Sequence, residues 1–232
     1  MVVSLVVAMS TGVLWASVQP VLEPELRSKF GLSQEISALI FLLIPLSYTI
    51  TTPLVGKALN KYKSFDLIYM MMIAYGICGV DFIFMGPSPL FLNLPRPLWL
   101  LLLTLFIQGI LTAFVVIPSM ELAFNKCGIN INNEQTPDAA LMAMISGMWL
   151  SAYAVGEFLG PTISGVVAEY ANFGWAMTVY GFMCLAFVLM MIIIKLYECM
   201  KKNRPSHKTS GENTQTDDIP MITVDECKPL LK

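Results

Sequence analysis

Six long apolar segments are the feature of this sequence that most restricts its fold. A helix needs about 20 mostly apolar residues to cross the roughly 30 Å hydrocarbon core of a bilayer. Because backbone groups in lipid must be hydrogen-bonded within the chain, each such segment is predicted to be a transmembrane helix. Residues 1–200 are therefore predicted to form an all-α membrane unit with six transmembrane helices. The six segments cover residues 2–22, 36–56, 65–86, 98–122, 139–166 and 173–196.

The composition supports lipid rather than water as the solvent of this chain. Charged residues make up 13% of the sequence and hydrophobic residues 56%, with a mean hydropathy of +0.69. This leaves too little polar surface to cover a soluble globule. The net charge of −2 offers no basic surface for nucleic acid. Residues 201–232 are polar and lack apolar periodicity, so they are predicted to form a disordered tail.

The distribution of lysine and arginine predicts the orientation of the helices. If the first helix starts in the cytoplasm, the outer connections hold only Arg27, Lys29 and Arg96. Basic residues are in excess in the cytoplasmic loops of membrane proteins, so both termini are predicted to be cytoplasmic. The inner connections then hold nine basic residues near the membrane: Lys57, Lys61, Lys63, Lys126, Lys195, Lys201, Lys202, Arg204 and Lys208.

Short motifs of enzymes are missing from the sequence. It contains no Walker A loop, GxGxxG, HExxH or GxSxG. The one histidine, His207, lies in the polar tail, and the five cysteines have no metal-binding spacing, so they are predicted to be small buried hydrophobic residues. The helices instead carry glycine, proline and isolated carboxylates, which is typical of a gated pore or carrier. We therefore predict a protein that is not an enzyme and that holds no metal or cofactor.

A glycine-rich stretch in the fifth segment is the most specific motif. Gly156, Gly160 and Gly165 fall near one face of a helix, where a neighbouring helix can approach closely. Pro161 removes one backbone hydrogen bond and permits a bend. This stretch resembles the glycine-proline motif of major-facilitator drug and amine antiporters, in the copy that belongs to the eleventh helix.

A second motif follows the second segment, in a predicted cytoplasmic loop. Gly56 precedes Asn60 and Lys61 at the spacing of the loop motif of the same superfamily. The family motif has aspartate where this chain has Asn60, and glycine where it has Lys63. The resemblance implies a gating role for Gly56 and Lys61, from which the acidic member of the charge relay is missing.

The chain resembles the vesicular amine transporters of solute carrier family 18, and in particular their polyamine-type branch. That family has twelve helices in two six-helix halves, with the substrate between the halves and coupling to proton antiport. The resemblance implies that this chain holds helices seven to twelve. The similar stretches are Ser47-Tyr48 to Thr52-Pro53-Leu54, Ile117-Pro118-Ser119, Gly160-Pro161-Thr162 and Phe173-Gly174-Trp175-Ala176.

Acidic residues of the family are replaced at two positions. Gln19 precedes the proline of the first helix where the family has an acid, and Asn125 lies where some members have another. Because amides cannot take up a proton, Glu121 and Glu157 remain as the carboxylates deep enough to bind a proton or an amine. A hydrogen-bonded structural acid is the alternative for Glu157, and a side chain reaching the membrane interface is the alternative for Glu121.

Other polar residues in the helices have competing interpretations. Tyr48 and Gln108 are predicted to line the pathway with Gln19, although single polar residues in helical bundles also join helices to one another. Asp81, near the outer end of the third segment, is predicted to reach the interface.

The tail carries a motif that is typical of a sorting signal. Glu226 precedes the pair Leu230-Leu231 by four residues, which resembles the acidic dileucine signal that clathrin adaptors bind. It predicts an intracellular vesicle, endosome or lysosome as the location, with the plasma membrane as the alternative.

Three functions remain open on these grounds. The first is one half of a carrier for small organic amines and protons, paired with an amino-terminal six-helix half in the lipid membrane. The second is a half-carrier that does not transport and instead acts as an interaction or regulatory subunit. A six-helix channel is disfavoured because the sequence has no pore loop or selectivity filter.

Overall fold

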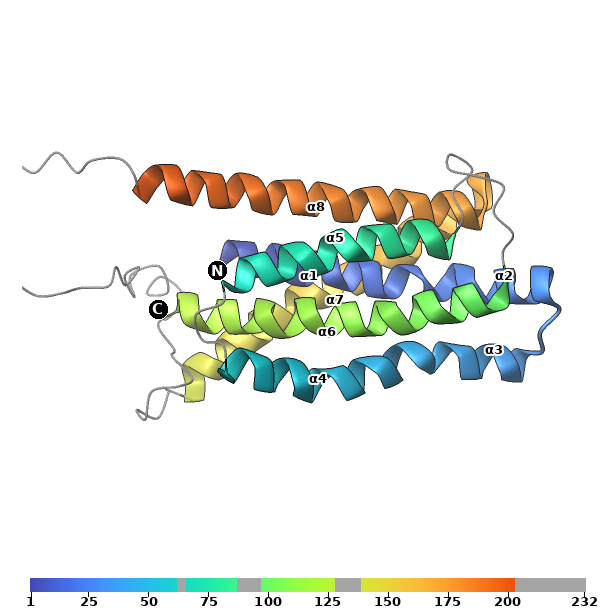
Figure 1. Ribbon diagram of the computed structural model, residues 1–232, viewed down its shortest axis with the longest axis horizontal. Coiled ribbons are helices and arrows are strands. Elements are labelled where there is room, and N and C mark those ends of the chain that lie inside the picture. Colours follow the sequence, from blue (N-terminus) through green and yellow to red (C-terminus); the bar gives the residue numbers. More distant parts are fainter. Residues whose placement is uncertain (62–65, 87–96, 128–138, 203–232) are drawn as a thin grey trace, which may run out of the picture.

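A computed structural model describes residues 1–61, 66–86, 97–127 and 139–202, and the described residues form a bundle of long helices (Figure 1). In Figure 1 the chain crosses the length of the bundle back and forth, so neighbouring spans alternate in direction. The helices are α1 (Val2–Ser17), α2 (Gln19–Phe30), α3 (Gln34–Phe41), α4 (Leu43–Lys61), α5 (Leu67–Met85), α6 (Leu98–Lys126), α7 (Ala139–Ala171) and α8 (Phe173–Lys202).

These helices make six candidate membrane spans. The helices outnumber the spans because two of the spans are interrupted. The first comprises α1 and α2 and the second comprises α3 and α4. Pro20 and Pro45 follow the two interruptions by two or three residues, and a proline removes the backbone donor that would continue a helix. The predicted all-α fold with six transmembrane helices is confirmed, although the sequence did not reveal these two breaks.

Several helices run further than the apolar segments that predicted them. Segment 98–122 becomes a helix that ends at Lys126, and segment 139–166 becomes one that ends at Ala171. The stretch from Gly56 to Lys61, which was predicted to be a loop, is the last part of α4. Hydropathy marks only the part of a helix that lies in hydrocarbon, and polar turns can extend a helix beyond it.

Small residues bring α1 and α7 together. A Cβ atom added at Gly156 would lie 2.9 Å from the backbone nitrogen of Val13, and one at Gly160 would lie 3.1 Å from that of Ser17. Gly12 faces the same contact from α1, where an added Cβ would lie 3.2 Å from the Cα of Gly156. Each of these positions leaves no room for a side chain, so close backbone approach holds this pair of helices together.

Gly165 does not share in that packing. A Cβ atom added there would meet nothing within 4 Å, and the same holds for Gly56. The grouping of Gly165 with the other two glycines was therefore wrong, because a spacing of five residues turns it away from the face that contacts α1.

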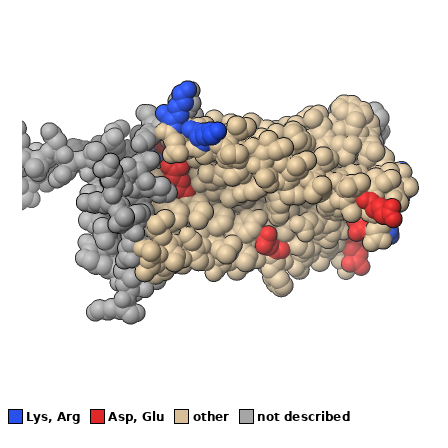
Figure 2. Space-filling view, turned by 90° about the horizontal axis from the view of Figure 1, so that it is seen from below, with Lys and Arg blue, Asp and Glu red and all other residues tan. Residues whose placement is uncertain are grey.

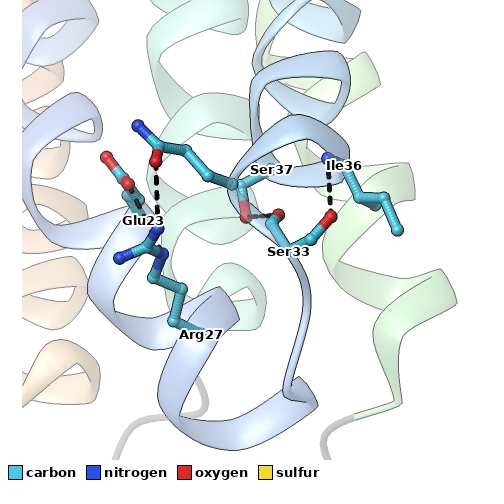
Figure 3. A network of polar contacts seen from close by, with 6 residues as sticks. Glu23, Arg27, Ser33, Ile36 and Ser37 are labelled. Atoms are coloured by element: carbon cyan, nitrogen blue, oxygen red, sulfur yellow. Dashed lines mark hydrogen bonds and ion pairs between the residues drawn. The ribbon is translucent and has the colours of Figure 1, made fainter.

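The ends of the bundle carry most of the described charges, and the long face between them is largely uncharged (Figure 2). At one end, Lys195 of α8 pairs with Asp66, which caps the first turn of α5. At the other end, Arg27 of α2 lies 3.7 Å from Glu23 and donates a hydrogen bond to Gln34 at 3.3 Å, which ties α2 to the start of α3 (Figure 3). We call these the Lys195 end and the Arg27 end.

Candidate functional site

A pocket of about 260 Å³ lies where α1, α4, α6 and α7 meet. Most of its wall is aromatic or apolar, and Thr112 adds a hydroxyl group. Three separate spans contribute aromatic rings, so the pocket depends on the assembled bundle. The lining residues are Trp15, Pro45, Tyr48, Thr112, Val116, Trp149, Leu150 and Tyr153.

Four aromatic rings surround this pocket in two pairs. Trp15 and Tyr48 meet edge to face with ring centroids 6.0 Å apart, and Trp149 and Tyr153 stack at 5.5 Å with an angle of 10° between their planes. The Nε1 atom of Trp149 also donates a hydrogen bond to the Oγ atom of Ser119 at 3.2 Å, which fixes the indole ring. Aromatic faces attract cations, so this arrangement can hold an ammonium group.

Glu157 lies one helical turn beyond Tyr153 on α7. The carboxylate and the Tyr153 hydroxyl interact, so the acid lies at the edge of the aromatic pocket. Glu157 is also level with Gly12, near the middle of the contact between α1 and α7. Its side chain is nevertheless exposed on the bundle surface, whereas Gly156 and Gly160 face inward. The acid therefore points away from the chain's own core.

Two other predicted pathway residues lie further along the bundle. Gln19, at the start of α2, is exposed and follows Trp15 by one turn, toward the Arg27 end. Glu121 is half-buried near the last turns of α6, toward the Lys195 end. Neither residue lines the pocket. Figure 2 shows an acidic side chain within the middle of the largely uncharged face.

Gln108 does not line the pocket. Its side chain is 3% exposed, and its Oε1 atom accepts a hydrogen bond of 3.4 Å from the Sγ atom of Cys78 on α5. This contact fits the alternative interpretation, that Gln108 joins helices to one another, and Gln108 is not among the residues that line the pocket. Thr112, one turn later, is the α6 residue that reaches the pocket.

Sequence reasoning missed three of the four aromatic residues of the pocket. Trp15, Trp149 and Tyr153 were not singled out, while Tyr48 was. A signal was present, since Trp149, Tyr153 and Glu157 follow one another at intervals of four residues and so share one helix face. Among the residues that the structure describes, no group of three or more histidine, cysteine or acidic side chains could hold a metal ion.

The predicted sorting residues Glu226, Leu230 and Leu231 lie outside the described residues, as does Lys63 of the loop motif. Gly56 and Lys61 do lie within them, on the last turns of α4 at the Lys195 end, and Lys61 is exposed there. Pro161 is half-buried within α7, one residue after the close contact at Gly160.

Six membrane-length helices and a lateral pocket bounded by four of the spans define a unit of a polytopic α-helical membrane protein. The chain belongs to the Major Facilitator Superfamily, whose sequence profile matches residues 3–223. The pocket therefore lies in a fold whose family is known for transport.

Individual relatives make the comparison more specific than the superfamily. The chain is 28% identical over 209 residues to the protein named MFS-type transporter SLC18B1 of Rattus norvegicus, and this match covers 88% of the chain and 44% of the rat protein. The proteins of the same name from Mus musculus and Homo sapiens match at the same identity and share of their length. The resemblance to solute carrier family 18 is confirmed, and the chain spans about half the length of these relatives.

Proposed function

We propose that this chain is the carboxy-terminal half of a secondary carrier that exchanges small organic amines for protons. The observation that carries the proposal is the aromatic pocket with Glu157 at its edge. The pocket opens among α1, α4, α6 and α7, and the name of the relatives identifies them as transporters. The chain acts by binding and moving a solute rather than by changing its covalent bonds.

The chemistry of the pocket suits an amine cation. A cation over an aromatic face gains about 0.5–1 kcal/mol at an exposed site and about 2 kcal/mol when water is excluded. Rings from Trp15, Tyr48, Trp149 and Tyr153 can share one ammonium group, and the carboxylate of Glu157 adds an opposite charge one turn away. A proton on Glu157 removes that charge, so the amine and the proton compete for the site.

Transport needs a second wall for this pocket. In carriers built from two repeats, the substrate binds at the interface of the repeats and access alternates as one repeat moves against the other. The exposed position of Glu157, and the share of the relatives that the chain leaves uncovered, both support an amino-terminal six-helix half as the partner.

Amine binding to the chain itself tests the pocket. We expect spermidine to produce a saturable change in the tryptophan fluorescence of the purified chain, because Trp15 and Trp149 line the pocket. Tyr153→Ala should weaken this binding by about tenfold, which corresponds to about 1.4 kcal/mol. Tyr170→Ala is the matched control, since Tyr170 is an exposed tyrosine on the same helix. Equal affinities for the two variants would show that the amine does not bind in this pocket.

We also propose that the protein resides in an intracellular vesicle, endosome or lysosome with both termini in the cytoplasm, and that an adaptor of the clathrin type binds its tail. An epitope placed after Lys232 should be stained when only the plasma membrane is permeabilised.

Changing Leu230 and Leu231 together to alanine should increase the surface fraction of the protein severalfold, measured by surface biotinylation. An unchanged surface fraction would dismiss the sorting signal.

A non-transporting half-carrier is the second candidate, and the exposed position of Glu157 on the bundle surface, where another protein unit can contact it, is the observation that favours it. In this case the chain would bind a full-length carrier as an interaction or regulatory subunit. Transport measurements on the chain with and without a second half separate the two candidates.

A further inference from the structure

Asp81 is a buried acid that the substrate pocket does not use. It lies on α5, and only 6% of its surface is exposed. Its Oδ2 atom is the one side-chain oxygen or nitrogen atom in the described residues that is fully buried without a hydrogen-bond partner. The expectation that Asp81 reaches the membrane interface was therefore wrong, because the residue faces the inside of the bundle.

The neighbours of Asp81 follow from the register of the helices. α5 packs against α6 on one side and α8 on the other. Cys78 contacts Gln108, and Met85 shares a small cavity with Leu101, so the antiparallel register places Asp81 level with residues 104 and 105 of α6. On α6 this level holds Thr104, whose hydroxyl is already donated to the carbonyl of Leu101 at 2.9 Å.

Neutral groups surround this part of the interior. Among the residues that the structure describes, the titratable side chains on the facing surfaces are those of Tyr75 and Cys78 on α5 and of Tyr180 and Cys184 on α8. Tyr75 interacts with Ser10 of α1 at 2.6 Å, and Tyr180 donates to the carbonyl of Gly160 at 3.0 Å. Neither a tyrosine hydroxyl nor a cysteine thiol carries a positive charge, so none of these groups can compensate an ionised Asp81.

Described cations on the helices around Asp81 lie at the ends of the bundle. Lys195 of α8 pairs with Asp66 at one end, and Lys126 is the last residue of α6 at that same end. At the opposite end, Arg27 and Lys29 of α2 form ion pairs with Glu23 and Glu25. Arg96 lies outside the described residues. No described ion pair links Asp81 to any of these groups.

We propose that Asp81 is a proton-binding site in the interior formed by α5, α6 and α8, separate from the amine pocket. An ionised carboxylate is strongly disfavoured in a membrane interior unless a cation or several hydrogen-bond donors compensate its charge. Asp81 has neither a described cation partner nor a donor for Oδ2, so a proton on the carboxyl group is the remaining way to neutralise it. The ligand of this site is a proton.

The site and the amine pocket lie at different levels along α6: Asp81 is level with residues 104 and 105, and Thr112 of the pocket follows about two turns later. Gln108 faces α5 beside Cys78, whereas Thr112 and Val116 face the pocket. An amine in the pocket therefore does not touch Asp81. The proposal does not depend on the proposed transport reaction, because it concerns the protonation of a group inside the chain.

Infrared spectroscopy of the full chain in lipid at neutral pH tests this proposal. We expect the carbonyl stretch of a protonated carboxylic acid, and we expect it to shift when aspartate carries ¹³C in its side-chain carboxyl group. Asp81→Asn should lose this band. Asp66→Asn is the matched control and should retain it, because Asp66 is ion-paired with Lys195 at the end of the bundle.

A complementary variant keeps Asp81 and replaces the five other aspartates by asparagine, so the test does not depend on whether Asp81→Asn folds. This variant should keep the full labelled band. The proposal is overturned if the wild-type chain shows no protonated aspartate at neutral pH, if the band survives in Asp81→Asn, or if it disappears from the variant that retains only Asp81.

Discussion

Replacing Glu157 by glutamine will abolish amine accumulation driven by a pH gradient and leave the amount of folded protein unchanged. We expect this in a completed carrier, in which the chain is fused to the half of a relative that it does not cover. Glutamine keeps the size and hydrogen bonding of the side chain but cannot bind and release a proton. Because Glu157 is exposed rather than packed in the core, the substitution should not disturb the fold.

Two measurements on the same variant make this prediction specific. Accumulation of spermidine against its gradient should fall to the level of empty liposomes. Exchange of labelled for unlabelled spermidine should continue at a weaker affinity, since the aromatic pocket is intact but the negative charge of Glu157 is gone. Glu169→Gln is the matched control, because Glu169 is an exposed acid near the end of the same helix. Normal accumulation by Glu157→Gln would leave Glu157 a structural acid and make Glu121 the next candidate.

Gly156→Ala will destabilise the chain, although alanine is the better helix former. The added methyl group would press against the backbone of Met9 and lie 2.9 Å from the nitrogen of Val13, so α1 and α7 would have to separate. Overpacking of this kind costs about 1–3 kcal/mol. We expect a clear fall in the melting temperature of the detergent-solubilised chain and a lower yield of monodisperse protein.

Gly165→Ala is the control for this change and should act in the opposite direction. It lies on the same helix, and its methyl group would meet nothing within 4 Å. Alanine is favoured over glycine within a helix by about 1 kcal/mol, so the melting temperature should stay the same or rise. Equal losses at both positions would mean that the close contact between α1 and α7 does not carry the stability assigned to it.

Hydropathy was enough to predict the class of fold and the positions of the six spans. A span is defined by a long run of apolar residues, which is a local property of the sequence. The breaks before Pro20 and Pro45 were missed because a single proline can also sit within a continuous helix, as Pro161 does in α7. The ends of α6 and α7 were missed because helices continue into the polar region that hydropathy excludes.

The site was predicted only in part, because it depends on which faces of the helices meet. Tyr48 and Glu157 were singled out as polar residues in apolar segments, and both lie at or beside the pocket. Gln108 met the same criterion but faces α5. Trp15 and Trp149 look like ordinary apolar residues in the sequence, and only the packing of α1 and α7 brings them to one pocket.

The burial of Asp81 also depends on helix packing and so could not be predicted from the local sequence. Its place near the end of an apolar segment predicted an interfacial acid. The packing of α5 against both α6 and α8, which no local pattern records, leaves this side chain facing inward.

Uptake of labelled spermidine into proteoliposomes with an imposed pH gradient tests the central claim, that this chain is one half of an amine carrier. The chain alone should accumulate no more than empty liposomes, because one six-helix half supplies one wall of the pathway. The completed carrier should accumulate spermidine many-fold, and a protonophore should remove this accumulation. Accumulation by the chain alone, or none by a folded completed carrier, would contradict the account.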